Sequence, residues 1–207
     1  RDCVTIAVGG RAEAASAAIV AVGPHQLRQA FANEALAAHP PLPAAIDVLD
    51  ALAYEPIVTI WLGYAANVAM PGPIARLDDA PGQWVFDRPD VLARAQAQRP
   101  LLAHMLAVVV SANGPHMALA QEALATAVDA QLRRLQPSLP PCVWSQVIAE
   151  KRATYACAPG RARPAGPRLA PGIYLAGDYV DADYPATLEA AVRSGKAAAQ
   201  ALLSDRA

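Results

Sequence analysis

The fold is decided by Gly172-Ile-Tyr-Leu-Ala-Gly-Asp-Tyr-Val-Asp-Ala-Asp-Tyr-Pro-Ala-Thr-Leu-Glu-Ala-Ala-Val-Arg-Ser-Gly195, a segment that predicts a strand, a turn and the start of a helix. Residues 173–176 form a short apolar run, which is typical of a buried strand in a mostly parallel sheet. Gly177 and Asp178 end this strand. Ligands of open α/β sheets bind at the carboxyl ends of the strands, where an Asp can accept hydrogen bonds from ligand hydroxyls. We therefore expect a ligand site at Asp178.

A helix is predicted directly after this turn. Residues 186–203 are rich in Ala and Leu, with Thr187 near the start and Glu189 in the first turn. The first N–H groups of a helix have no intrahelical acceptor, and the helix dipole is positive at this end. The helix start therefore favours an electron-rich or anionic group at the same edge of the sheet.

Three pieces of this segment carry a resemblance to a known family. They are Leu-Ala-Gly-Asp-Tyr at 175–179, Tyr-Pro-Ala-Thr-Leu-Glu at 184–189 and Ala-Val-Arg-Ser-Gly at 191–195. Together they resemble the C-terminal flavin motif of the phytoene desaturase and amine oxidase superfamily, which implies FAD as the cofactor. The resemblance implies that Asp178, after Gly177, contacts the ribityl chain. It also implies that backbone N–H groups of Thr187, Leu188 and Glu189 face the pyrimidine edge of the isoalloxazine.

The sequence departs from this motif at two positions. Ala190 stands where the family usually has Gly, and Val180 stands where it often has Thr. We expect the additional methyl group of Ala190 to crowd the helix against the flavin.

A second stretch is also expected near the flavin. Residues 18–22 predict an apolar strand that ends in Gly23-Pro24. In the resembled family a strand at this point approaches the flavin, which makes Pro24 a candidate contact. His25 follows, but a His after a strand-end Pro is more often a helix-start or surface residue.

Other stretches narrow the resemblance. Residues 54–59, 82–88 and 144–154 resemble the squalene-associated FAD-dependent desaturases, also called hydroxysqualene dehydroxylases. The resemblance implies an oxidoreductase of a linear isoprenoid or triterpenoid that converts hydroxysqualene to squalene. The alternatives are a carotenoid desaturase of the phytoene type, an amine oxidase, or a truncated binding module without cofactor. Lys151 and Arg152 are candidate catalytic groups near the reacting end of the substrate, and an exposed pair at a strand margin is an equally good interpretation.

Composition sets limits on function. The chain has 207 residues, 55% of them hydrophobic, and a formal net charge of −1. It can bury a sizeable core in one large domain or two small ones, and no basic face for nucleic acid is indicated. The longest apolar run, 101–110, is about half of the ~20 residues that a membrane-spanning helix needs. We expect a cytoplasmic protein, with peripheral membrane contact as a further expectation for an enzyme of isoprenoids.

Neither metal nor disulfide sites are expected. The three cysteines are far apart and odd in number, which fits a reducing compartment. The histidines are scattered, and none stands in a ligand-like pair. These residues are Cys3, Cys142, Cys157, His25, His39, His104 and His116.

We expect a mixed α/β fold in two domains. Residues 1–38 and 151–207 are assigned to an FAD-binding domain, and residues 39–150 to a substrate domain. The strands expected in a mixed or antiparallel substrate-domain sheet are 56–64, 83–87 and 101–111, with a further strand at 144–154. The expected helices are 26–38, 44–52 and 115–135.

One motif is missing. The pyrophosphate of a dinucleotide is normally held by a glycine-rich turn, and no G-x-G-x-x-G occurs in the sequence. We therefore expect the C-terminal part of a longer enzyme, without the N-terminal FAD-binding segment. We also expect this part to be inactive alone and to hold FAD weakly or not at all.

Overall fold

The computed structural model describes residues 3–206 and has a mixed α/β fold, as predicted. The chain forms two compact units. Unit 1 consists of Arg1–Ala53 and Tyr155–Ala207, and unit 2 consists of Tyr54–Thr154. The chain therefore leaves the first unit once and returns to it. The chain passes from unit 1 to unit 2 between residues 53 and 54 and returns between residues 154 and 155. Both boundaries lie later than the expected 38/39 and 150/151.

Unit 1 contains the sheet that carries the strand predicted at 173–176. Its strand order is β3 (Ala18–Val20), β10 (Ile173–Leu175), β9 (Arg168–Ala170). β10 is parallel to β3 and antiparallel to β9, and all three β10 residues are buried. A hairpin of β1 (Val4–Val8) and β2 (Arg11–Ala15) precedes β3. The prediction of a buried, parallel strand before Gly177 is confirmed.

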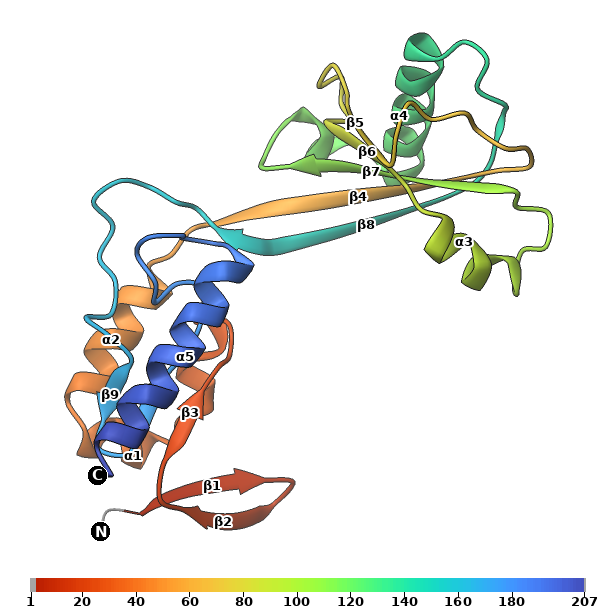
Figure 1. Ribbon diagram of the computed structural model, residues 1–207. Coiled ribbons are helices and arrows are strands. Elements are labelled where there is room, and N and C mark those ends of the chain that lie inside the picture. Colours follow the sequence, from red (N-terminus) through yellow and green to blue (C-terminus); the bar gives the residue numbers. More distant parts are fainter. Residues whose placement is uncertain (1–2, 207) are drawn as a thin grey trace. The chain divides into compact units, whose positions relative to one another are not determined.

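The helix α5 (Leu188–Ser204) covers β10 (Figure 1). The small side chains of Ala198 and Ala201 pack with Tyr174 and Ala176 in a buried cluster. These alanines lie in the C-terminal half of α5 and allow it to approach β10 closely, and Ser194, nearer the helix start, accepts a hydrogen bond from the N–H of Gly177 at the strand end. This is the arrangement expected of the strand, turn and helix.

The predicted helix at 26–38 is wrong in its extent. The structure has two 3-10 helices, Pro24–Gln26 and Arg28–Ala30, followed by the short α1 (Asn33–Ala38). The proline run after it begins α2 (Pro41–Asp50), because proline is tolerated in the first turn of a helix. α2 contacts β9 and the first 3-10 helix, so it belongs to unit 1. Because α2 packs within unit 1, the chain enters unit 2 only after residue 53.

Unit 2 contains a five-stranded sheet of order β5-β6-β7-β4-β8. The pairs β5/β6, β6/β7 and β4/β7 are antiparallel. The strands are β4 (Tyr54–Tyr64), β5 (Ile74–Arg76), β6 (Trp84–Asp87), β7 (His104–Ser111) and β8 (Cys142–Tyr155). The separation of this sheet from β3 and β10 was predicted, whereas β5 was not.

The core of unit 2 lies between this sheet and α4 (Gln121–Leu135) (Figure 1). On β4 the buried residues Val58, Ile60 and Leu62 alternate with partly exposed ones, and they pack against Leu124 and Val128 of α4. α4 starts later than predicted, after a 3-10 helix at Pro115–Ala118. The helix α3 (Pro89–Gln96) was not predicted and contacts β7.

Candidate functional site

The candidate site is the edge of unit 1 at which β3 and β10 end. Since these strands are parallel, the chain following each of them leaves the sheet at the same edge. Pro24 follows β3, is buried and begins the first 3-10 helix, which also contains His25. Asp178 follows β10. The structure therefore brings together two stretches that are far apart in the sequence and were both predicted to contact a flavin.

Asp178 is a partly buried carboxylate. Burial raises the pKa of its carboxyl group, and the backbone N–H groups of Asp178 and Tyr179 oppose this shift. Within residues 3–206, no side chain donates a hydrogen bond to the carboxylate. Lone pairs of the carboxylate are therefore available to hydroxyl groups of a ligand.

The glycine at position 177 leaves space for a neighbouring aromatic ring. A Cβ atom at this position would lie 2.2 Å from Cε1 of Tyr179, so the glycine makes room for that ring. The Tyr179 ring is buried, and its hydroxyl donates to the carbonyl oxygen of Val22 at 2.7 Å. This bond ties the chain after β3 to the turn after β10.

Thr187 is the N-cap of α5. Its Oγ1 accepts a hydrogen bond from the N–H of Ala190 at 3.1 Å and donates to the carbonyl of Tyr184 at 2.6 Å. The cap leaves the N–H groups of Leu188 and Glu189 without an intrahelical acceptor, as at any helix start. These are the two backbone donors that the helix can offer to a ligand.

Side chains at this helix start point in different directions. Leu188 is 87% exposed, and the Glu189 carboxylate is paired with Arg193 at 2.7 Å. Ala190 is fully buried, so its methyl group packs against protein atoms and the expected crowding of a ligand is not supported. Ser194, quoted in the motif without a role, accepts from the N–H of Gly177 at 2.9 Å and donates to the carbonyl of Ala191. It fastens the helix to the strand end.

Two residues that sequence reasoning missed hold the turn between strand and helix. Tyr155 donates to the carbonyl of Asp178, and Arg163 donates to the carbonyl of Asp181 at 2.7 Å. Both come from the chain that returns to unit 1. The one signal in the sequence for Tyr155 was its position as an aromatic residue directly after the strand predicted at 144–154, which leads back to the flavin motif.

Lys151 and Arg152 belong to β8 and lie in unit 2. Both are exposed, and the Arg152 guanidinium lies 5.8 Å from the centroid of the Tyr54 ring. The structure does not bring them together with Asp178 within one unit. Their catalytic role stays a prediction.

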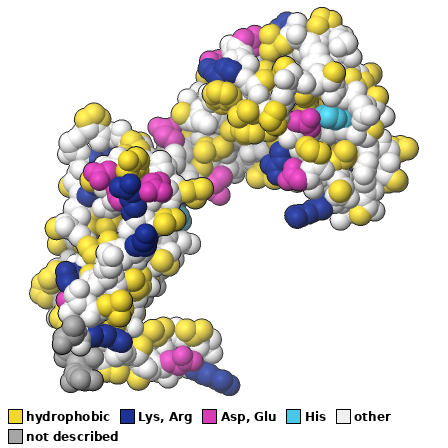
Figure 2. All heavy atoms as spheres, in the orientation of Figure 1, with side chains coloured by type: hydrophobic (Ala, Val, Ile, Leu, Met, Phe, Trp, Pro, Cys, Tyr) yellow, Lys and Arg dark blue, Asp and Glu magenta, His cyan; other side chains and the backbone are white. Residues whose placement is uncertain are grey.

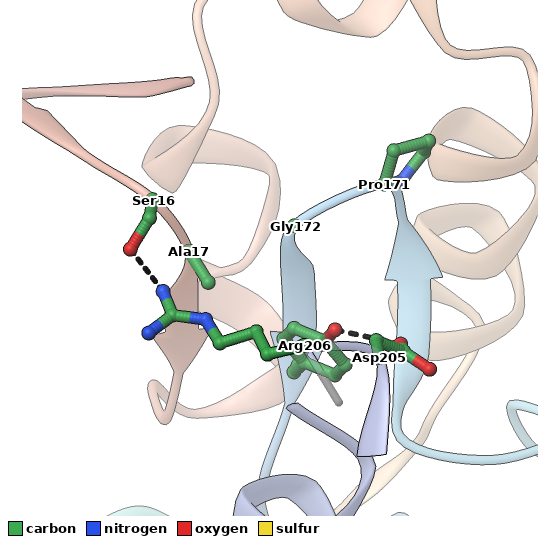
Figure 3. Close-up of a pocket in the computed structure, with 7 residues that line it drawn as sticks. Ser16, Ala17, Pro171, Gly172, Asp205 and Arg206 are labelled. Atoms are coloured by element: carbon green, nitrogen blue, oxygen red, sulfur yellow. Dashed lines mark hydrogen bonds between the residues drawn. The ribbon is translucent and has the colours of Figure 1, made fainter. Parts of the chain in front are cut away.

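A hollow in unit 1 lies at the opposite end of β10 (Figure 3). There Asp205 binds Arg168 and the Tyr174 hydroxyl, and Arg168 foremost lowers the pKa of Asp205 to about 2. Arg206 reaches Ser16 across the hollow (Figure 3). These charged groups are engaged with one another, and the hollow is not the predicted ligand site.

Comparison with known proteins decides the family. The family model described as flavin containing amine oxidoreductase matches residues 1–203. The chain belongs to this family. The cofactor of flavin containing amine oxidoreductases is a flavin, which agrees with the motif at Asp178 and Thr187.

Individual relatives give more detail. A hydroxysqualene dehydroxylase of Rhodopseudomonas palustris is 31% identical over 175 residues, which is 80% of this chain and 37% of that protein. A zeta-carotene desaturase of Synechocystis is 34% identical over 117 residues, covering 55% of this chain and 24% of that protein. The cyclohexylamine oxidase of Brevibacterium oxydans has the same fold with a TM-score of 0.63 and 15% identity, covering 99% of this chain and 46% of that chain. The chain thus spans less than half the length of each.

A flavin fits the residues at this edge as they stand. A flavin offers hydroxyl donors on its ribityl chain and electron-rich acceptors on its pyrimidine ring. Asp178 supplies an acceptor without a side-chain partner, and the start of α5 supplies N–H donors. Within residues 3–206, no three His, Cys, Asp or Glu side chains come together as a metal site would require.

Proposed function

We propose that this chain forms the isoalloxazine side of an FAD-dependent oxidoreductase that acts on a linear isoprenoid, with hydroxysqualene as the first candidate. The observation that carries the proposal is the edge at which a half-buried Asp178 and the residue before the capped start of α5, Ala186, are bound to the same Tyr155 hydroxyl. The resemblance to a hydroxysqualene dehydroxylase over most of the chain supports the substrate class. Zeta-carotene, named in the second relative, is also a linear isoprenoid.

The residues of the site have separate tasks in this proposal. Asp178 accepts a hydrogen bond from a ribityl hydroxyl, and the N–H groups of Leu188 and Glu189 donate to the pyrimidine edge. Gly177 and Pro24 contribute close backbone approach and shape, and Thr187 fixes the helix start. FAD supplies the redox chemistry when bound, while the protein positions the reactants and excludes water.

Unit 2 is proposed to cover the substrate with the face of its sheet that is turned away from α4. On β4 the residues of this face include Thr59 and Trp61, and Trp61 is paired with Ala107 of β7. Trp84 of β6 stands opposite Val109 on the same face. Figure 2 shows hydrophobic side chains spread over the visible surface of each unit, with Lys and Arg scattered among them. The guanidinium groups of Arg88 and Arg76 lie 5.5 and 5.4 Å from the ring centroids of Trp61 and Trp84. The aromatic rings of this face suit an isoprenoid chain, and Lys151 and Arg152 remain the proposed polar groups near its reacting end.

Tryptophan fluorescence tests the substrate proposal, because all three tryptophans, Trp61, Trp84 and Trp144, lie in unit 2. We expect hydroxysqualene to change this fluorescence saturably, and Trp61→Phe to reduce the response. A saturated hydrocarbon of the same chain length as hydroxysqualene and cyclohexylamine serve as comparison ligands. A response to the amine alone would favour the amine oxidase alternative, and a stronger response to zeta-carotene would favour a carotenoid desaturase.

Nuclear magnetic resonance tests the flavin site in the same chain. FAD at roughly millimolar concentration should shift the amide signals of Leu188 and Glu189, since even weak binding is populated there. Asp178→Ala should weaken the effect about tenfold, whereas Asp183→Asn, at an exposed carboxylate in the same turn, should leave it unchanged. A wild-type chain without any shift would support the alternative of a cofactor-free binding module.

None of the helices within residues 3–206 is long and apolar enough to cross a membrane. We propose peripheral contact with a membrane surface as the route by which an isoprenoid reaches unit 2, and sedimentation with phospholipid vesicles measures it.

A further inference from the structure

Tyr155 is the last residue of β8 and belongs to unit 1. It is only 4% exposed. Its hydroxyl donates to the carbonyl oxygen of Asp178 at 3.2 Å. It accepts from the N–H of Ala186 at 2.9 Å and from Nη1 of Arg163 at 3.4 Å. A tyrosine hydroxyl has one proton and two acceptor sites, so these three bonds use all of them.

The two backbone partners of this hydroxyl stand at the two ends of one turn. Asp178 follows the strand β10, and Ala186 comes directly before Thr187, the N-cap of α5. One buried oxygen therefore sets the spacing between the proposed ribityl contact and the proposed pyrimidine contact. Arg163 adds a bond to the carbonyl of Asp181 in the middle of the same turn.

Ala186 is held in a conformation that a free chain would avoid. Its φ angle is +58°, in the left-handed region that residues with a Cβ atom rarely adopt. Such a residue persists only where its surroundings hold it, and these positions cluster at ligand sites. The bond from the Ala186 N–H to Tyr155 is the restraint that the structure shows.

The Tyr155 hydroxyl keeps its proton under ordinary conditions. Burial, the largest cause, raises the pKa of Tyr155 above its usual value, although Arg163 opposes the shift. The proton needed for the bond to Asp178 is therefore present throughout the neutral range. Loss of the hydroxyl would leave the Asp178 carbonyl and the Ala186 N–H without this partner.

We propose, on the basis of the function proposed above, that Tyr155 is a positioning residue: its hydroxyl holds the turn between β10 and α5 so that Asp178 and the helix start face the flavin together. It acts through the backbone of the turn and is not itself a catalytic residue.

Tyr155→Phe removes the hydroxyl and keeps the ring. The matched control is Tyr174→Phe, because Tyr174 has an equally buried ring in the same unit and donates to Asp205 at the other end of β10. Asp205 keeps its two bonds to Arg168 in this control. Both variants lose the hydroxyl of a buried tyrosine, and only Tyr155→Phe touches the turn.

Amide hydrogen exchange of the chain without cofactor is the first measurement. We expect the Ala186 amide to exchange about tenfold faster in Tyr155→Phe and to stay within about twofold of wild type in Tyr174→Phe. The second measurement is the dissociation constant for FAD from amide shifts, which should rise about tenfold in Tyr155→Phe alone.

Unchanged exchange of Ala186 in Tyr155→Phe overturns the proposal. Equal acceleration throughout unit 1 in both variants also overturns it, because the hydroxyl would then contribute only to global stability. Faster exchange of the turn without weaker FAD binding would overturn the link to the flavin. If FAD shifts no amide of the wild-type chain, the proposed function fails, while the exchange data still decide whether Tyr155 holds the turn.

Discussion

Single residues at the candidate site are fixed by contacts that the sequence does not display. Gly177 is an example: the pattern of an apolar run followed by Gly-Asp located it, but its cause is the Tyr179 ring packed against it. Ser194 and Tyr155 are equally central and were not predicted as contacts of the turn. Which hydroxyl meets which backbone group depends on how a strand, a turn and a helix pack, and spacing along the chain does not specify this.

Gly177→Ala should destabilise the protein by about 1–3 kcal/mol, because the new methyl group overlaps the Tyr179 ring and the ring is anchored at Val22. Gly195→Ala is the matched control. A Cβ atom at Gly195 meets nothing within 4 Å, and alanine in the interior of α5 should stabilise it by about 0.5–1 kcal/mol. Urea denaturation measures both. Equal effects of the two variants would contradict the steric explanation.

Asp178 carries a stability cost that depends on pH. Because burial raises its folded pKa, the folded state binds a proton more readily than the unfolded state, and stability is lost as the pH rises past the usual carboxyl value of 3.8. Asp178→Asn should therefore raise the melting temperature at pH 7, and the difference should disappear near pH 3, where both states of the wild type are protonated. A charge retained at a cost to stability is typical of a ligand site. A variant less stable than wild type at pH 7 would show that the carboxylate stabilises the fold.

At the scale of elements, strands were predicted better than helices. The runs at 56–64 and 83–87 are rich in β-branched and aromatic residues, and both are strands of unit 2. The proline run at 40–43 lies between the helices predicted at 26–38 and 44–52, whereas in the structure it begins α2, because proline disfavours a helix interior but suits its first turn. Proline alone does not tell which side of it is helical. The burial of Leu42, Ile46 and Leu49 decides the matter, and it requires knowledge of tertiary packing.

The cap of α5 is the element on which the helix start depends. Thr187→Ala should cost about 1 kcal/mol, since the N–H of Ala190 loses the Oγ1 acceptor. Thr187→Ser keeps a hydroxyl and should stay within a few tenths of a kcal/mol of wild type. Thermal unfolding followed by circular dichroism distinguishes them. Equal losses in both variants would assign the effect to the Thr187 methyl group instead of the cap.

At the scale of the molecule, the sequence predicted that the chain leaves one sheet, builds another and returns. The sequence placed the boundaries at 38/39 and 150/151, and the first of them falls later in the structure because α2 packs beside β9. Unit 2 is one continuous segment with its own core of Val58, Ile60, Val108 and Val128 among others. Residues 54–154 should therefore fold alone, with a cooperative urea transition in tryptophan fluorescence and about 5 kcal/mol or more of stability. A gradual transition would show that unit 1 is needed.

The last prediction is that this 207-residue chain binds FAD weakly, with a dissociation constant of about ten micromolar or higher. FAD is normally held at two ends, and the phosphate end needs a glycine-rich loop and a helix start. The sequence contains no such loop, so the candidate contacts are those at Asp178 and the start of α5.

Each hydrogen bond of this kind contributes on the order of 1 kcal/mol net. A few of them are offset by the several kcal/mol lost when a large flexible ligand is immobilised. Isothermal titration calorimetry measures the result, with Asp178→Ala as the variant that should weaken even this binding. Saturable nanomolar binding would mean that residues other than a glycine-rich loop form a phosphate site in this chain. Arg206, which lines the hollow at the end of β10 remote from Asp178, and Arg168, which pairs with Asp205 of the same hollow, would then be the first residues to substitute.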